Sequence, residues 1–117
     1  MTGIANDSDD DLLRLAHGGD EGAFDALYRR HQAGIFRYAL QMTGSRAVAE
    51  DVTQEVFIAL IHENGFVSSR GTLSAYLYGI AHNQVRKHVD RDRRLVSFDE
   101  QEQNEPKLDA APLRDLT

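Results

Sequence analysis

Apolar residues recur at steps of three and four along three long segments of this chain, and little else in the sequence is as regular. Such spacing places them on one face of an α-helix, which has 3.6 residues per turn. No stretch of useful length alternates apolar and polar residues as a half-buried strand does. The sequence therefore predicts an all-α fold, a compact bundle of about four helices that share a core. The stripes comprise Phe24, Leu27, Tyr28, His31, Ile35, Tyr38, Ala39 and Met42; then Val48, Val52, Val56, Ala59 and Leu60; then Leu73, Leu77, Ile80, Ala81, Val85 and Val89.

Capping residues and glycines predict where these helices begin and end. A short first helix is expected after the acidic run 9–11, stopped by the glycine pair at 18 and 19. The second is expected to open at Asp20 and to end at Gly44, where Ser45 can cap the third. The third should end near residues 62–65, and the last should start near Thr72 after a loop rich in Gly, Ser and Asn.

A chain of 117 residues has room for one domain. We expect a flexible N-terminus over residues 1–10, the helical domain over 11–95, and a linker or tail over 96–117. The segment 99–117 is acidic, contains both prolines and lacks a sustained apolar period, which favours a disordered acidic tail.

The formal net charge of −6 conceals an uneven distribution. Residues 1–25 carry seven acidic and one basic residue, and residues 99–117 carry six acidic and two basic. The middle segment, 26–98, carries ten basic and six acidic residues. Since salt screens exposed charges beyond about 8 Å, a ligand responds to the local patch more than to the total. The middle of the chain can therefore still meet nucleic-acid phosphates.

Several classes of function are disfavoured. The chain has no cysteine, which excludes disulfides and thiolate metal sites and suits a cytoplasmic location. It shows neither a signal peptide nor the run of about 18 apolar residues that a membrane span needs. The five histidines lack zinc-binding spacing, and no glycine-rich loop matches a phosphate-binding motif. We therefore expect no catalytic residue, no metal and no cofactor, and hence no enzyme.

The third predicted helix carries Asp51, Gln54, Glu55 and Ile58 on the face opposite its valines. An apolar side chain beside two carboxylates suits docking to a partner with basic residues. By spacing alone, an ordinary solvated helix face is the commoner explanation.

The last predicted helix combines aromatic and basic residues on one flank. Tyr76 and Asn83 precede a basic run that includes Arg86, Lys87 and Arg91. Basic side chains neutralise phosphates, and an aromatic ring offers a stacking surface for an unpaired base. This combination favours a melted strand over a duplex. The alternative is a basic helix terminus that complements its own dipole, with Asp90 and Asp92 forming local ion pairs.

Two motifs carry a resemblance to a known family. The sequences AEDVTQEVF at 49–57 and AYLYGIAHN at 75–83, followed by the basic run, resemble the second conserved region of the extracytoplasmic-function (ECF) sigma factors, bacterial sigma-70-type proteins. The likeness extends from about Asp11 to Arg94. It implies a region 2-like helical bundle that binds core RNA polymerase and melts the minus-ten element of promoters.

The resemblance also implies roles for particular residues. Asp51, Gln54, Glu55 and Ile58 would bind the clamp helices of the polymerase beta-prime subunit. The non-template single strand of promoter DNA would be bound by the last helix and the loop before it, with Tyr76 as wedge or platform and Asn83 as reader of a base edge. An anti-sigma factor is a usual further partner. The DNA-binding set is Phe66, Ser68, Ser69, Arg70, Tyr76, Asn83, Arg86, Lys87 and Arg91.

The sequence departs from the family pattern in three places. Tyr76 stands where tryptophan is usual, His82 replaces a frequent arginine, and no helix-turn-helix pattern for the minus-thirty-five element follows. Two other functions stay open from the residues alone. One is a helical adaptor that binds proteins but not DNA, and the other is a small metal-dependent hydrolase, against which the histidine spacing argues.

Overall fold

The computed structural model describes residues 7–103, and the side chains of residues 7–95. The predicted all-α fold is confirmed in this part of the chain. Its helices are α2 (Asp9–His17), α3 (Glu21–Thr43), α4 (Arg46–His62) and α5 (Leu73–Gln103), with a short 3-10 helix, η1 (Ser68–Arg70), before α5.

All four α-helices begin with a side-chain cap. The side-chain oxygens of Ser8, Asp20, Ser45 and Thr72 each accept a hydrogen bond from the backbone N–H three residues later, at 3.1 Å. Such caps each stabilise a helix by about 1 kcal/mol. Gly44 ends α3 in the left-handed conformation, φ 68°, which a side chain would disfavour. The predicted boundaries at residues 20, 44, 45 and 72 are therefore confirmed.

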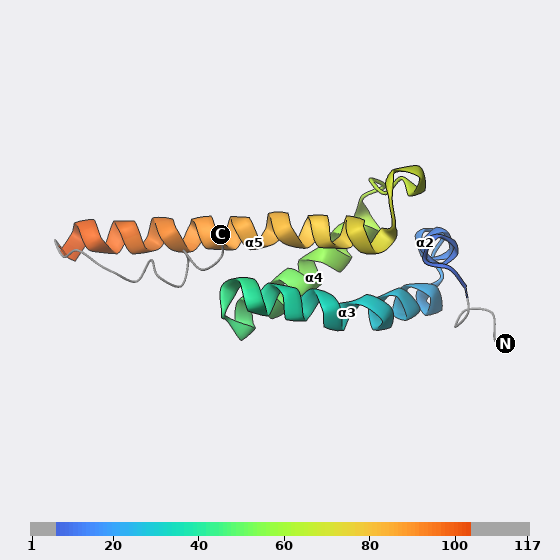
Figure 1. The fold of residues 1–117 in the computed structure, drawn as a ribbon, viewed down its shortest axis with the longest axis horizontal. Coiled ribbons are helices and arrows are strands. Elements are labelled where there is room, and N and C mark those ends of the chain that lie inside the picture. The colour runs from blue at the N-terminus through green and yellow to red at the C-terminus, as the bar shows by residue number, and fades with distance from the viewer. Residues whose placement is uncertain (1–6, 104–117) are drawn as a thin grey trace.

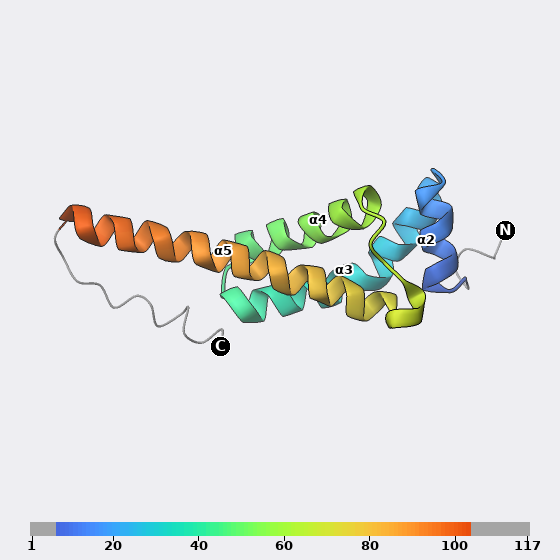
Figure 2. The same cartoon turned by 90° about the horizontal axis from the view of Figure 1, so that it is seen from above.

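Helices α3, α4 and α5 form a three-helix bundle, and α2 crosses one end of it (Figures 1 and 2). In the second view α5 lies over the seam between the other two (Figure 2). None of the helices in the described part of the chain combines the length and apolar character that a bilayer crossing requires. The largest fully buried side chains, which form the centre of the core, are Leu12, Leu27, Ile35, Val52, Val56, Leu60, Leu73 and Leu77.

The helices extend past residues 11 and 95, the bounds predicted for the helical domain. Asp9 lies in the first turn of α2, and its carboxylate oxygens contact Arg30 Nη1 and His31 Nε2, each at 2.9 Å. Through this contact Asp9, which precedes the predicted start of the domain at residue 11, fastens α2 to α3. At the other end, α5 continues to Gln103 because no glycine or proline occurs between Gly79 and Pro106. Residues 1–6 and 104–117, where most of the predicted flexible N-terminus and acidic tail fall, lie outside the described residues.

Two helical glycines should respond oppositely to alanine. A Cβ at Gly79 meets nothing within 4 Å, whereas a Cβ at Gly34 would lie 2.5 Å from the Tyr78 hydroxyl. Alanine is better than glycine in a helix by about 1 kcal/mol, so Gly79→Ala should raise the free energy of unfolding by that amount. Gly34→Ala should lower it by up to about 2 kcal/mol, because overpacking costs about 1–3 kcal/mol. Urea unfolding of the two variants measures both, and equal shifts would contradict the close approach at Gly34.

Candidate functional site

The face of α4 that carries the predicted docking residues is accessible. Asp51 and Gln54 are exposed, and Ile58 is 57% exposed, more than most large apolar residues of a folded domain. The valines Val52 and Val56 on the opposite side are completely buried. The structure thus places an apolar side chain and polar neighbours on one solvent-facing surface.

An apolar groove adjoins this face. It has a volume of about 620 Å³ and lies between α4 and the start of α3, with Gln54 and Ile58 on its border. Phe57 forms its floor, in edge-on contact with the ring of Tyr28 at 4.9 Å and that of Phe24 at 6.2 Å between centroids. Sequence analysis placed Phe24 and Tyr28 in a core stripe and missed the groove, because its two walls come from segments about thirty residues apart.

Glu55 differs from its three companions. It is half-buried, and its two carboxylate oxygens lie 3.1 and 3.2 Å from Nε2 of His88 on α5. Nδ1 of the same imidazole lies 2.7 Å from Nη2 of Arg91. Glu55, assigned to docking, is therefore also a contact between α4 and α5, and it reaches Arg91, assigned to DNA, through one side chain.

Two of the predicted DNA-binding aromatics lie together. The rings of Phe66 and Tyr76 are 5.4 Å apart between centroids, tilted by 60°, and both are half-buried. The Tyr76 hydroxyl lies against Gly65, where a Cβ would come within 2.6 Å of it. The glycine thus lets the loop close over the tyrosine, and the two rings form a fixed aromatic surface at the start of α5.

The loop residues Ser68, Ser69 and Arg70 are exposed and form η1. A hollow of about 430 Å³ beside Phe66 and Ser68 is walled by α2, through Asp10, Leu13, Arg14 and His17, together with Asn64. Asn83 is not among these residues. It lies seven residues beyond Tyr76, about 10 Å further along α5 at 1.5 Å per residue. This hollow therefore does not bring the loop residues together with Asn83.

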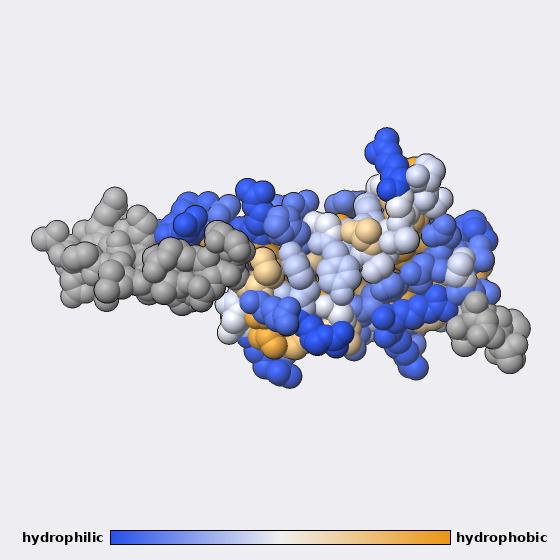
Figure 3. Space-filling view, viewed as in Figure 1, coloured by the Kyte–Doolittle hydropathy of each residue, from blue (hydrophilic) through white to orange (hydrophobic). Residues whose placement is uncertain are grey.

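Beyond the aromatic pair, α5 exposes a polar row. Asn83, Lys87 and Arg91 are exposed and spaced by four residues, and Arg86 is exposed beside them. Within the described residues, no ion pair involves Arg86 or Lys87, and Asp90 and Asp92 pair with no base. Hydrophilic side chains line the upper edge of the molecule along part of α5 in Figure 3. The basic side chains are thus available to a polyanion.

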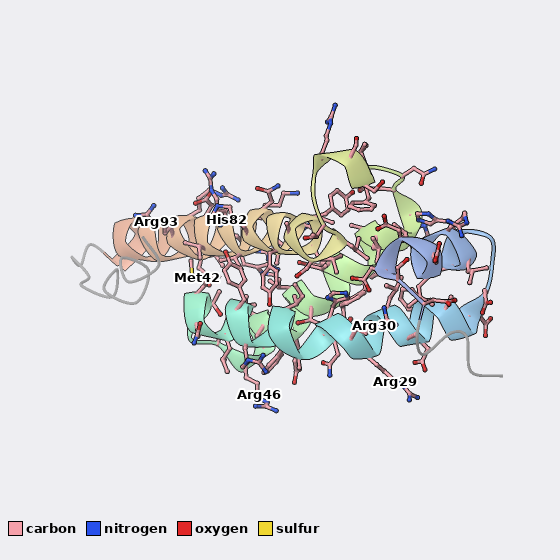
Figure 4. The ribbon with its side chains drawn as sticks, turned by 45° about the vertical axis from the view of Figure 1, so that its right-hand side comes forward. Arg29, Arg30, Met42, Arg46, His82 and Arg93 are labelled. Carbon is pink, nitrogen blue, oxygen red and sulfur yellow. The ribbon has the colours of Figure 1, made fainter. Side chains whose placement is uncertain are left out.

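A second aromatic cluster on α5 was not predicted. The Tyr38 hydroxyl of α3 lies 3.1 Å from Nδ1 of His82, and its ring meets that of Tyr78 edge-on at 5.6 Å. Loss of hydration raises the pKa of Tyr38. In Figure 4, His82 and Arg93 lie along α5, and Met42 marks the end of α3 that faces it. The cluster fastens α3 to α5.

Potential metal ligands do not gather in the described part of the chain. No group of three or more His, Asp or Glu side chains there could hold an ion.

The comparisons with known proteins agree with the motifs. The Sigma-70 region 2 family matches residues 27–95. The ECF RNA polymerase sigma factor BldN of Streptomyces coelicolor is 33% identical over 84 residues, which are 71% of this chain and 32% of that protein. SigL of Mycobacterium tuberculosis, an ECF RNA polymerase sigma factor, is 38% identical over 74 residues, 62% of this chain and 40% of SigL.

A third relative is the RNA polymerase sigma factor CarQ of Myxococcus xanthus, 27% identical over 94 residues, 80% of this chain and 54% of CarQ. The chain thus spans between about a third and about a half of the length of these relatives. No solved structure matches it significantly. The family match covers more than half of the chain and contains both motifs, helix α4 and most of α5. The chain therefore belongs to the ECF sigma factors of the sigma-70 family, as a region 2 domain.

Proposed function

We propose that this domain acts in transcription initiation, in which α4 binds core RNA polymerase and α5 binds the non-template strand of the promoter minus-ten element. The observation that carries the proposal is the row Asn83, Lys87 and Arg91, exposed beyond the fixed aromatic pair Phe66 and Tyr76. A stacking surface followed by an amide and cations is what a single strand with unstacked bases requires.

The polymerase contact would use Asp51, Gln54 and Ile58, with the groove beside them. Ile58 would supply buried apolar area, and Asp51 would complement basic residues of the beta-prime clamp helices and set the encounter rate. Glu55 would contribute the exposed part of its carboxylate, because His88 Nε2 already contacts both of its oxygens from one side.

Three kinds of side chain would share the DNA contact: aromatic rings that stack on bases, an amide that recognises a base edge, and cations that bind phosphates. An aromatic surface contributes about 1–3 kcal/mol per stacked base, which can offset the few kcal/mol needed to unstack that base. The Asn83 amide can donate to and accept from one base edge. Arg86, Lys87, Arg91 and the loop residues 68–70 would contact phosphates and hold the register.

No bond chemistry is needed for this role. The domain would act as a binding module without cofactor, in the cytoplasm with the polymerase, and an anti-sigma factor would be a further partner. Contact with the minus-thirty-five element would belong to another domain or to a partner.

Two substitutions on the same row should separate reading from charge. Asn83→Ala should weaken binding of a fluorescent minus-ten strand by about tenfold, or about 1.4 kcal/mol, which lies within the range of about 1–3 kcal/mol for one base contact. The remaining affinity should be near that for a scrambled strand. Lys87→Ala should weaken binding of both strands equally and lower the salt slope by about 0.7, the value for one phosphate of a single strand. Fluorescence anisotropy at several salt concentrations measures both. Equal losses on the two strands from Asn83→Ala would remove its reading role.

The same assay tests the adaptor alternative. If the domain binds DNA, charge reversal by Arg86→Glu with Lys87→Glu should abolish strand binding at physiological salt. If the domain is an adaptor that uses α4, the same variant should still bind its protein partner, and the wild-type chain should show no strand binding. Wild-type protein that binds neither strand would therefore favour the adaptor.

A further inference from the structure

His88 is unusual among the polar residues of the domain. Only 7% exposed, it is one of two buried polar side chains in the described residues, the other being Thr53. The Thr53 hydroxyl bonds its own helix at the Ala49 carbonyl. His88 instead has partners on both ring nitrogens, on two different helices. A buried imidazole with both nitrogens engaged is held in one orientation.

The chemistry of the partners determines where the imidazole proton lies. An arginine guanidinium can only donate hydrogen bonds, so Nδ1 of His88, 2.7 Å from Arg91 Nη2, must be the acceptor. The ring proton is therefore on Nε2, which lies 3.1 and 3.2 Å from the Glu55 carboxylate oxygens and donates to them. The three side chains form a directed chain, from Arg91 to His88 to Glu55.

This hydrogen-bonded series uses one terminal nitrogen of Arg91, and the residue as a whole is exposed. Arginine has five N–H donors in a planar fork, so a guanidinium held at Nη2 can still present its other donors to a phosphate. A long exposed side chain ordinarily loses rotamer freedom when it binds, and holding it beforehand reduces that loss. Arg91 is also one helical turn beyond Lys87 on the exposed row.

We propose that His88 is a positioning residue, which receives its orientation from Glu55 on α4 and holds Arg91 on α5 ready for a backbone phosphate of the single strand. The proposal rests on the proposed function of the exposed row. It adds a buried residue to the DNA-binding machinery and makes the polymerase-facing helix part of it.

Strand binding by a set of His88 and Arg91 variants tests the proposal. His88→Leu removes both nitrogens at similar volume, whereas His88→Gln can still accept from Arg91 and donate to Glu55. At 0.15 M salt we expect Arg91→Ala to weaken binding of the minus-ten strand by about five- to tenfold, the effect of removing one charge-assisted hydrogen bond, and His88→Leu to weaken it by about threefold. The double variant should bind no more weakly than Arg91→Ala alone, and His88→Gln should stay within about twofold of wild type.

The double variant distinguishes positioning from a structural role. If His88 only stabilises the bundle, its loss adds fully to that of Arg91→Ala, and the proposal is overturned. It is also overturned if His88→Leu binds like wild type, or if Arg91→Ala has no effect. If one of these results is found but wild-type protein still binds the strand in a manner that depends on Asn83, only the positioning role of His88 is lost and the proposed function stands. If wild-type protein does not bind the strand, both the positioning role and the proposed function are lost.

Two further measurements guard against a variant that fails to fold. Glu55→Ala, checked for helicity by circular dichroism, removes the acceptor for Nε2 and should likewise cause a loss that does not add to that of Arg91→Ala. In wild-type protein without DNA, nitrogen-15 spectra of the imidazole at pH 7 should show a protonated Nε2 and an unprotonated Nδ1 for His88. A protonated Nδ1 would rule out the directed chain.

Discussion

Ile58→Arg should weaken binding of core RNA polymerase by about 100-fold. This is the effect of losing a central interface residue that contributes about 2–3 kcal/mol to the binding free energy. The substitution removes apolar area beside the groove and sets a guanidinium against a partner surface that we propose to be basic. Because Ile58 is 57% exposed, the fold should tolerate the change. Titration of labelled domain with core enzyme measures the loss.

Leu95→Arg provides a matched control, because Leu95 is also 57% exposed but lies far along α5. It should change polymerase binding by less than about threefold, within the range of neutral interface neighbours. Equal losses from the two arginine variants would mean that a general charge effect, and not the α4 face, determines binding.

Glu55→Arg would be a less clear test of the same face. Its cation would stand beside His88 and Arg91, where Glu55 now accepts a hydrogen bond, and a buried imidazole left without its partner costs about 1–3 kcal/mol. A loss of polymerase binding could then come from the α4–α5 contact. Asp51→Arg avoids this problem, because Asp51 is exposed and makes no ion pair among the described residues.

Leu77→Ala should lower the free energy of unfolding by about 2–5 kcal/mol, a large part of the 5–15 kcal/mol typical of a domain. Leu77 is completely buried where α5 packs on the other helices, so the substitution leaves a cavity that a three-helix bundle cannot readily fill. Urea unfolding followed by circular dichroism measures the change.

The comparison for this prediction is Leu95→Ala, the same chemical change at an exposed position of the same helix. It should shift the free energy of unfolding by less than about 0.5 kcal/mol. A comparable loss at both sites would indicate that the two leucines contribute to the free energy of unfolding only through helix propensity. The packing of Leu77 would then contribute nothing.

Much of the fold was predictable because its signals are local. A cap such as Ser45 bonds a backbone N–H three residues away, and an apolar stripe such as Val52 and Val56 is defined by neighbouring turns. The same holds for the exposed side of α5, since positions four apart share a helix face whatever packs behind them. The extent of α5, which continues to Gln103, did not follow from composition, because acidic residues favour a linker but do not by themselves stop a helix.

The candidate site was predictable only in part. That Asp51, Gln54, Ile58 and Asn83 would be exposed follows from helical period. The pairing of Phe66 with Tyr76, which depends on Gly65, does not follow from period, because a loop conformation sets it. The groove beside Ile58 does not follow from helical period either, because it forms only where two helices approach at a particular angle.

The sequence by itself determined which residues form helices, which side of each helix is apolar, and which family the motifs indicate, because these depend on residues within one or two turns. Only the tertiary structure decided that Glu55 meets His88, 33 residues away, and that Tyr78 fits over Gly34. Such contacts depend on the rotation and offset of one helix against another. Many side chains together determine that geometry through close packing, and no local pattern encodes it.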